Sequence, residues 1–134
     1  MDFVSIRIIT ADVARLAGFY ERVTGVQADW ASEDFAELRT AHGTLAIGST
    51  RTVPLFAPGS AQPASNRTVI IEFLVDDVDG VYKNLTGYVG DFVNEPTTMP
   101  WGNRALLFRD PDGNLVNFFT PVTPAAIEKF SRRA

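Results

Sequence analysis

Few side chains in this chain have the chemistry of common catalytic or metal sites. The 134 residues contain no cysteine and a single histidine, His42. Disulfides, thiolate metal sites and cysteine nucleophiles are therefore excluded, and one chain has too few histidines for a two-histidine metal site. His42 lies between Thr40 and Gly43 in a segment typical of a turn, so we interpret it as structural.

Arg7 and Glu72 are charged residues inside two segments that are rich in β-branched residues, 3–10 and 69–75. Strand alternation places them at corresponding positions of the two segments. One interpretation is a buried ion pair that joins two halves of the protein. The other is that they bind a polar ligand, or that Glu72 acts as a general base. We favour the ion pair or the ligand contact, because a neighbouring arginine keeps a carboxylate charged and weakly basic.

Trp101 and Arg104 follow Pro100 at the start of a predicted strand. An indole and a guanidinium are suited to a planar ligand, the first by stacking and the second by pairing with a carboxylate or phenolate. An alternative is that Pro100–Gly102 forms a turn whose aromatic side chain covers the core. Phe119 is a further aromatic candidate for ligand contact, as are three residues elsewhere in the chain, Trp30, Phe35 and Phe56.

A strand–helix–strands pattern in the first half must position the earlier of these residues. Residues 3–10 predict a strand that leads to Asp12 as a helix N-cap. Apolar residues then recur at steps of three and four up to Gly25, which predicts a helix over residues 12–24. The rest of this half is predicted to hold two strands, at 35–39 and 44–47, joined by a turn at 41–43.

The same pattern restarts at residue 68. Asp77 takes the place of Asp12 after the strand over 69–75, and Val78, Val81 and Leu85 repeat the helical spacing. The remaining strands of this half are predicted at 92–94, 104–108 and 115–119, and a turn is predicted at 110–113. Two copies are too few for a solenoid, so we expect the halves to complete each other around a shared hollow.

The resulting organisation is an α+β protein built from two βαβββ modules. We expect one domain with a proline-rich crossover loop between the modules and a tail helix that starts at Pro124 after the cap Thr123. The expected bounds are 1–122 for the domain, about 1–53 and 67–122 for the modules, about 54–66 for the loop and 123–134 for the tail helix.

Composition restricts the surroundings and partners of this domain. Hydrophobic residues make up 46% of the chain, but no stretch of eighteen apolar residues occurs, and no secretory signal is recognisable. We therefore expect a cytoplasmic protein that does not enter a membrane. The net charge is −4 and the basic residues are scattered, which argues against a nucleic-acid partner.

Several motifs resemble those of a known family in order and spacing. In the first half Asp12 leads to Phe19 and Tyr20 and then to Gly25, and in the second half four motifs occur in sequence, at 75–79, 94–96, 100–104 and 108–114. This series is similar to the vicinal oxygen chelate superfamily of glyoxalases, bleomycin-resistance proteins and dioxygenases. The resemblance covers all but the tail, and it implies a curved, half-barrel sheet around a central cavity.

The resemblance also implies where metal ligands would lie. In metal-dependent members, His and Glu side chains from four strands hold one divalent ion. The corresponding positions here are Ser5, Ile47, Ile70 and Asn117. Isoleucine has no donor atom, and one hydroxyl with one amide is a poor ligand set for a divalent metal. We therefore expect no metal and no cofactor.

The favoured function is binding, without catalysis, of a small, partly aromatic organic molecule in the cavity, as in bleomycin-resistance proteins. The ligand contacts would come from Arg7, Glu72, Trp101, Arg104, Asn117 and Phe119. One alternative is a lyase, isomerase or dioxygenase with an unorthodox metal site that includes Glu72 and Asn117, in which Glu72 is a catalytic candidate. Another alternative is a structural or partner-binding domain. Family members commonly assemble side by side, so the resemblance implies a homodimer.

Overall fold

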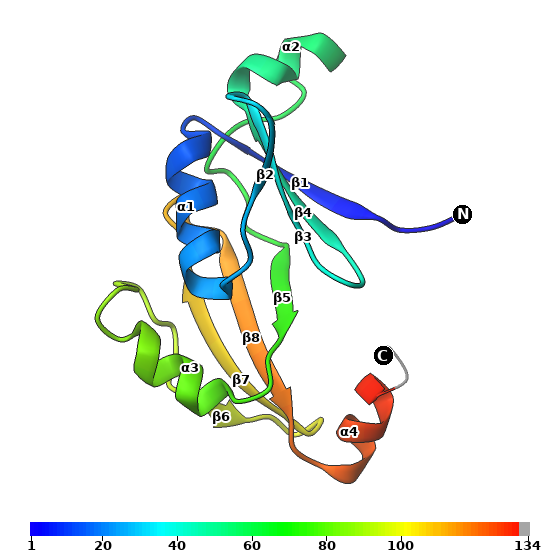
Figure 1. The fold of residues 1–134 in the computed structure, drawn as a ribbon, viewed down its shortest axis with the longest axis vertical. Helices are drawn as coiled ribbons and strands as arrows, with labels where there is room; N and C mark the ends of the chain where they lie inside the picture. Colours follow the sequence, from blue (N-terminus) through cyan, green and yellow to red (C-terminus); the bar gives the residue numbers. More distant parts are fainter. Residues whose placement is uncertain (132–134) are drawn as a thin grey trace. The chain divides into compact units, whose positions relative to one another are not determined.

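The computed structural model describes residues 1–131, and its ribbon is shown in Figure 1. The chain divides into two compact units. The first consists of Met1–Asn66 together with Pro111–Gly113, and the second of Arg67–Asp110 and the chain from Asn114 onward. Each unit contains one four-stranded sheet.

The first unit has the order strand, helix and three strands. Its elements are β1 Ser5–Thr10, α1 Val13–Thr24, β2 Asp29–Ser32, β3 Phe35–Arg39 and β4 Thr44–Ser49, followed by the 3-10 helix η1 Thr50–Thr52 and α2 Val53–Phe56. The sheet order is β1-β4-β3-β2, with β1 parallel to β4 and the other pairs antiparallel. The strands predicted over 35–39 and 44–47 are confirmed, whereas β2 was not located from the sequence.

Helix α1 forms where its apolar spacing and its caps predict it. The Asp12 carboxylate accepts a hydrogen bond from the backbone N–H of Arg15 at 3.1 Å, and Gly25 ends the helix at φ 73°. The helix packs against β3 and β4. Its buried face consists of Val13, Leu16, Ala17, Phe19, Tyr20 and Val23. This face and one side of the sheet make the core of the first unit.

The second unit repeats this order and adds a terminal helix. Its elements are β5 Ile70–Leu74, α3 Val78–Leu85, β6 Thr97–Thr98, β7 Asn103–Arg109, β8 Leu115–Pro121 and α4 Pro124–Ser131. The sheet order is β5-β8-β7-β6, and β5 is parallel to β8 as β1 is to β4. Helix α3 packs against β7 and β8 over Phe108 and Phe118, whose ring centroids are 4.9 Å apart.

Two predicted segments differ in the structure. Residues 92–94 form a single bridge, Phe92 to Phe108, and the strand that pairs with β7 on the side away from β8 is β6. The reason is that the Asn94 side-chain oxygen accepts a hydrogen bond from the backbone N–H of Leu107 at 2.7 Å. In a regular strand pair, a backbone carbonyl would accept this bond. The predicted crossover loop begins within α2, because proline is compatible with the first turn of a helix.

The tail helix begins at Pro124 as predicted, and the Thr123 hydroxyl accepts from the Ala126 N–H at 3.3 Å. The last three residues of the predicted tail, 132–134, lie outside the described residues. Within the described part of the chain, no helix is long and apolar enough to cross a membrane. The predicted α+β class with two βαβββ modules is confirmed, and the two sheets are open.

Candidate functional site

Each sheet has one face covered by its helix and one open face, and the strand register decides which side chains lie on each. In the second unit, Ile71 and Val116 are buried on the side of α3. The alternate residues form the open face, where Glu72 of β5, Asn117 of β8 and Leu107 of β7 stand in one row. Two of the predicted site residues therefore share a face.

Glu72 and Asn117 are in direct contact. The Asn117 Nδ2 donates a hydrogen bond of 2.8 Å to Glu72 Oε2. The Asn117 Oδ1 is buried and has no hydrogen-bond partner among the described residues. A buried amide oxygen without a partner is destabilising unless a ligand or water supplies a donor. The pair therefore offers a charged acceptor and a neutral acceptor side by side.

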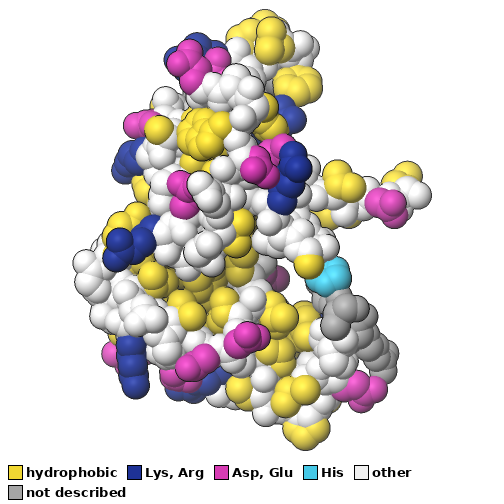
Figure 2. Space-filling view, viewed as in Figure 1, with side chains coloured by type: hydrophobic (Ala, Val, Ile, Leu, Met, Phe, Trp, Pro, Cys, Tyr) yellow, Lys and Arg dark blue, Asp and Glu magenta, His cyan; other side chains and the backbone are white. Residues whose placement is uncertain are grey.

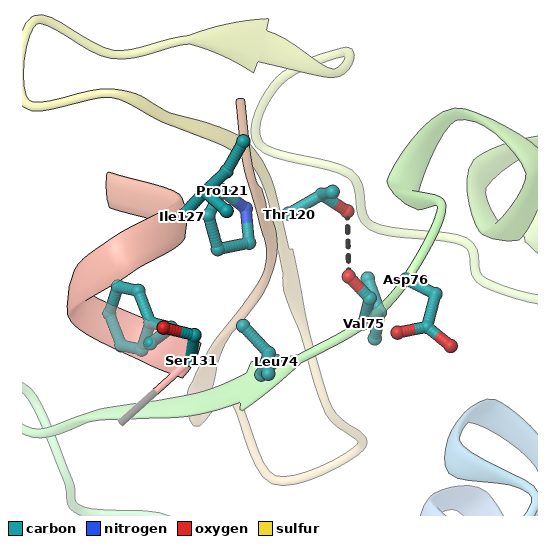
Figure 3. A pocket seen from close by; sticks show the side chains of 8 residues that line it. Leu74, Val75, Asp76, Thr120, Pro121, Ile127 and Ser131 are labelled. Atoms are coloured by element: carbon teal, nitrogen blue, oxygen red, sulfur yellow. Dashed lines mark hydrogen bonds between the residues drawn. The ribbon is translucent and has the colours of Figure 1, made fainter. Parts of the chain in front are cut away.

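An apolar pocket lies beside this face, at the end of the sheet where α4 packs on β8 (Figure 3). Its volume is about 320 Å³. It is lined by Leu74, Val75, Asp76, Thr120, Pro121, Ile127, Phe130 and Ser131. Leu74, which lines the pocket, is two residues from Glu72 on β5, so the two side chains lie on the same side of the strand.

Phe119 is on the open face, where α4 covers most of its side chain. It is 7% exposed, and its ring lies 5.0 Å from the ring of Phe130 in α4. The sequence suggested Phe119 as a contact only because it is an aromatic residue in a predicted strand. It did not show that α4 would cover it, since the docking of a terminal helix has no local sequence signal.

Arg104 lies on the other face of the second sheet, with the side chains that face α3. Its Nε and Nη2 donate to Asp79 Oδ2 and Oδ1 of α3 at 2.8 and 3.0 Å. Both carboxylate oxygens are thus bound by the guanidinium, and the contact lowers the pKa of Asp79 and raises that of Arg104. This placement separates Arg104 from Glu72 and Asn117 by the thickness of the sheet.

Trp101 lies in the turn between β6 and β7 and is 69% exposed. The alternative of an aromatic lid over the core is therefore wrong. The following Gly102 adopts φ 96° and its carbonyl accepts from the Val122 N–H at 2.9 Å. The turn is thus tied to the segment that leads into α4, and it holds the indole in solvent.

Arg7 lies on the open face of the first sheet, where its guanidinium carbon is 4.7 Å from the centroid of Phe35 and 5.4 Å from that of Phe56. Arg7 and Glu72 are both exposed. Each has contacts within its own unit, and an ion pair between them stays a prediction. His42 is exposed in its predicted turn, in which the Thr40 N–H donates to the Gly43 carbonyl at 3.0 Å.

The register corrects one of the implied metal-ligand positions. Asn117 pairs with Glu72, and the corresponding pair in the first sheet is Ala46 with Arg7. Ala46, not Ile47, is therefore the counterpart of Asn117, because Ile47 is fully buried on the opposite side. Among residues 1–131 no group of three His, Cys, Asp or Glu side chains is arranged to hold a metal. The donor set does not fit a divalent metal.

Comparisons with known proteins agree with this class of fold. The family model described as Glyoxalase/Bleomycin resistance protein/Dioxygenase superfamily matches residues 2–118. The chain therefore belongs to this superfamily. The resemblance seen in the sequence motifs is confirmed.

Individual relatives are more distant. An uncharacterised protein of Bacillus subtilis, YraH, is 24% identical over 125 residues, which cover 89% of this chain and 98% of that protein. A protein of unknown function from Agrobacterium tumefaciens has a crystal structure that aligns with a TM-score of 0.78 at 24% identity, covering 91% of this chain and 95% of that one.

A structure described as a glyoxalase/bleomycin resistance protein/dioxygenase family enzyme from Burkholderia phytofirmans aligns with a TM-score of 0.79. It is 20% identical, and the alignment covers 91% of this chain and all of that one. These structures share the fold with this chain.

Proposed function

We propose that the protein binds a small, partly aromatic organic molecule on the open face of the second sheet, without a metal ion. The observation that carries this proposal is the unpartnered, buried Oδ1 of Asn117 beside the Glu72 carboxylate. Both oxygens are acceptors, so the ligand would present a hydrogen-bond donor such as an amine, hydroxyl or amide N–H.

The surroundings of this pair support an apolar body for the ligand. Ile70, Leu74 and Leu107 share the open face with Glu72, and the first two are about half exposed. A surface of this kind, with few polar groups among apolar side chains, is typical of small-molecule sites. The adjoining pocket of about 320 Å³ is at the lower end of the range for such sites, which favours a small ligand or one part of a larger one.

The main alternative is a metal-dependent enzyme of the same superfamily that uses Glu72 and Asn117 as ligands. One carboxylate and one amide leave most of a divalent ion's coordination unfilled. Ser5, Ala46 and Ile70, which take the remaining positions, supply one hydroxyl between them. Binding without a metal therefore accounts better for these side chains.

The test is an unbiased ligand screen by native mass spectrometry, followed by titration of each hit with variants. Asn117→Leu keeps the side-chain size but removes the acceptor, and we expect about a tenfold loss of affinity because one hydrogen bond in a buried site is lost. Glu72→Gln should weaken ligands that carry a positive charge. Glu95→Gln, which neutralises an exposed glutamate elsewhere in the second unit, is the matched control.

Two outcomes would contradict the proposal. One is that the Asn117 and Glu72 variants bind every hit as the wild type does. The other is the retention of about one divalent ion per chain after dialysis, lost on Glu72→Ala, which would support the metal-dependent alternative instead. The proposal also includes the cytoplasmic location expected from the sequence, which fractionation of the source cells would check.

A further inference from the structure

The first unit contains an arginine whose guanidinium lies over two aromatic rings and which has no anionic partner among the described residues. The guanidinium of Arg7 on β1 lies over Phe35 of β3 and Phe56 of α2, at 4.7 and 5.4 Å from the ring centroids. Within the described first unit, no carboxylate or carbonyl accepts a hydrogen bond from it. This differs from Arg39 and Arg51 of the same unit, which pair with Asp29 and Asp34.

A gap in the side chains of β4 lets Arg7 reach these rings. Gly48 pairs with Phe35, and a Cβ atom on Gly48 would stand 3.6 Å from Cδ of Arg7 and 3.3 Å from Thr52 Oγ1. The methylene groups of Arg7 thus cross β4 over a residue without a side chain. The next residue on this side of β4 is Ala46, whose side chain is also small. Little side-chain volume therefore stands on the sheet beside the guanidinium.

The rings hold the guanidinium and leave its N–H groups open. Stacking on aromatic faces uses the plane of a guanidinium, whereas its five N–H groups point outward in that plane and match the two oxygens of a carboxylate. Phe56 is 73% exposed and Leu55 is 83% exposed, and Figure 2 shows hydrophobic side chains in solvent over α2. An anion paired with Arg7 would therefore meet apolar surface next to its charge.

We propose that Arg7, Phe35 and Phe56 form a binding site for the carboxylate of a small aromatic acid. The carboxylate pairs with the guanidinium, and the aromatic body contacts the exposed ring of Phe56. This site lies in the first unit and does not depend on the function proposed for the second sheet. We call it the arginine–aromatic site.

The sheet also limits the charge of the ligand. Arg7, Ala46 and Glu37 stand in one row across β1, β4 and β3. Neighbouring strands are about 4.8 Å apart, so Glu37 lies roughly two strand spacings from Arg7. A second carboxylate on a ligand that extends over Ala46 would approach Glu37, and like charges repel. Glu37 is itself paired with Arg39 at 3.4 Å, so the repulsion is partial, and the arginine–aromatic site favours monoanions over dianions by a modest factor.

The test uses benzoate, with benzamide as the neutral probe of the same shape and isophthalate as the dianion. Titrations of the full chain followed by amide NMR should give a millimolar dissociation constant for benzoate, with shifts at residues 7, 35 and 56. Benzamide should bind at least several-fold more weakly, and isophthalate more weakly by a modest factor. Equal binding of benzamide and benzoate, or no benzoate shifts at millimolar concentration, would overturn the proposal.

Variants distinguish the guanidinium from charge alone. Arg7→Lys keeps the positive charge but loses the planar fork, and we expect about a tenfold loss of benzoate affinity. Phe56→Ala removes an exposed ring and should weaken benzoate several-fold while the amide spectrum elsewhere stays unchanged. Arg67→Lys, at an exposed arginine outside the first unit, should leave benzoate binding as in the wild type. Wild-type affinity in both Arg7→Lys and Phe56→Ala would refute the assignment.

Discussion

Asp110 and Asn114 are buried polar residues that close the turn between β7 and β8. The Asp110 carboxylate accepts from the backbone N–H of Asn114 at 2.9 Å and from its Nδ2 at 2.8 Å. Between them, Gly113 adopts φ 83°, which a residue with a side chain rarely does. The motif over 108–114 that resembles the superfamily thus has a structural role here, because it fixes the hairpin that carries Asn117.

We expect Asp110→Ala to lower the free energy of unfolding by about 3 kcal/mol, since two hydrogen bonds to a buried charged group are lost. Urea unfolding monitored by circular dichroism would measure this change. Asp112→Ala is a useful comparison in the same turn, because Asp112 is less buried. A loss for Asp110→Ala no larger than that for Asp112→Ala would show that these bonds do not hold the turn.

The ion pair of Asp79 and Arg104 makes a pH-dependent contribution to stability. The contact with Arg104 lowers the pKa of Asp79 in the folded protein. A group with a lowered folded pKa stabilises the fold above its unfolded pKa, about 3.9 for aspartate, and this stabilisation is lost as the pH falls. The wild type should therefore be more stable than Asp79→Asn at neutral pH, and the difference should shrink below about pH 4.

Unfolding of both proteins in urea at a series of pH values would test this. Because the pair is exposed to solvent, the difference should also decrease at high salt. The double variant Asp79→Asn/Arg104→Gln serves as the control, since it removes both charges. A difference between wild type and Asp79→Asn that stays constant down to pH 2 would contradict the assignment.

Among the structural elements, the two helix starts show how far the sequence determines the fold. Asp12 and Asp77 cap α1 and α3 with the same backbone φ of −142°, and each accepts from the N–H three residues later at 3.1 Å. The alignment of Asp12 with Asp77 was predicted from their places as N-caps between a β-branched segment and a helical apolar spacing. Caps and helical periodicity are local features, so the sequence contains them directly.

Elements that depend on distant partners were predicted less well. β2 and β6 are exposed and short, and β6 has only two residues, so neither has an alternating pattern long enough to recognise. The same limit applies to side chains. Strand alternation and the family resemblance singled out Glu72 and Asn117 separately, and the register shows that they share one face. Nothing in the sequence indicated that Asp79 would form an ion pair with Arg104 or that α4 would cover Phe119.

The turn between β6 and β7 is the element that fixes the start of α4. A Cβ atom on Gly102 would overlap the Thr123 hydroxyl and lie 3.0 Å from Cβ of Ala126, and its φ of 96° disfavours a side chain. We expect Gly102→Ala to destabilise the protein by more than about 1 kcal/mol, because strain and the steric contact add. Thermal unfolding of Gly102→Ala beside Gly87→Ala would check this, since a Cβ on Gly87 meets no atom within 4 Å. Equal effects of the two substitutions would show that the turn tolerates the side chain.

For the whole molecule, the sheets predict self-association. The sheet orders leave β1 and β2 at the edges of one sheet and β5 and β6 at the edges of the other. Edge strands expose unpaired backbone groups that commonly pair or become covered in an assembly, and closed dimers are the most frequent oligomers. We therefore expect a homodimer by sedimentation at micromolar concentration. A monomer at that concentration would contradict the prediction.

The parallel pairing of the first and last strands has a consequence for the continuity of the chain. β1 pairs with β4 and β5 with β8, so every interstrand hydrogen bond joins two strands of the same module. The covalent link between the modules, residues 57–69, takes part in neither ladder. A protease that cut this link would break one peptide bond and no strand pairing. We therefore expect the two modules, made as separate polypeptides, to form the same two sheets.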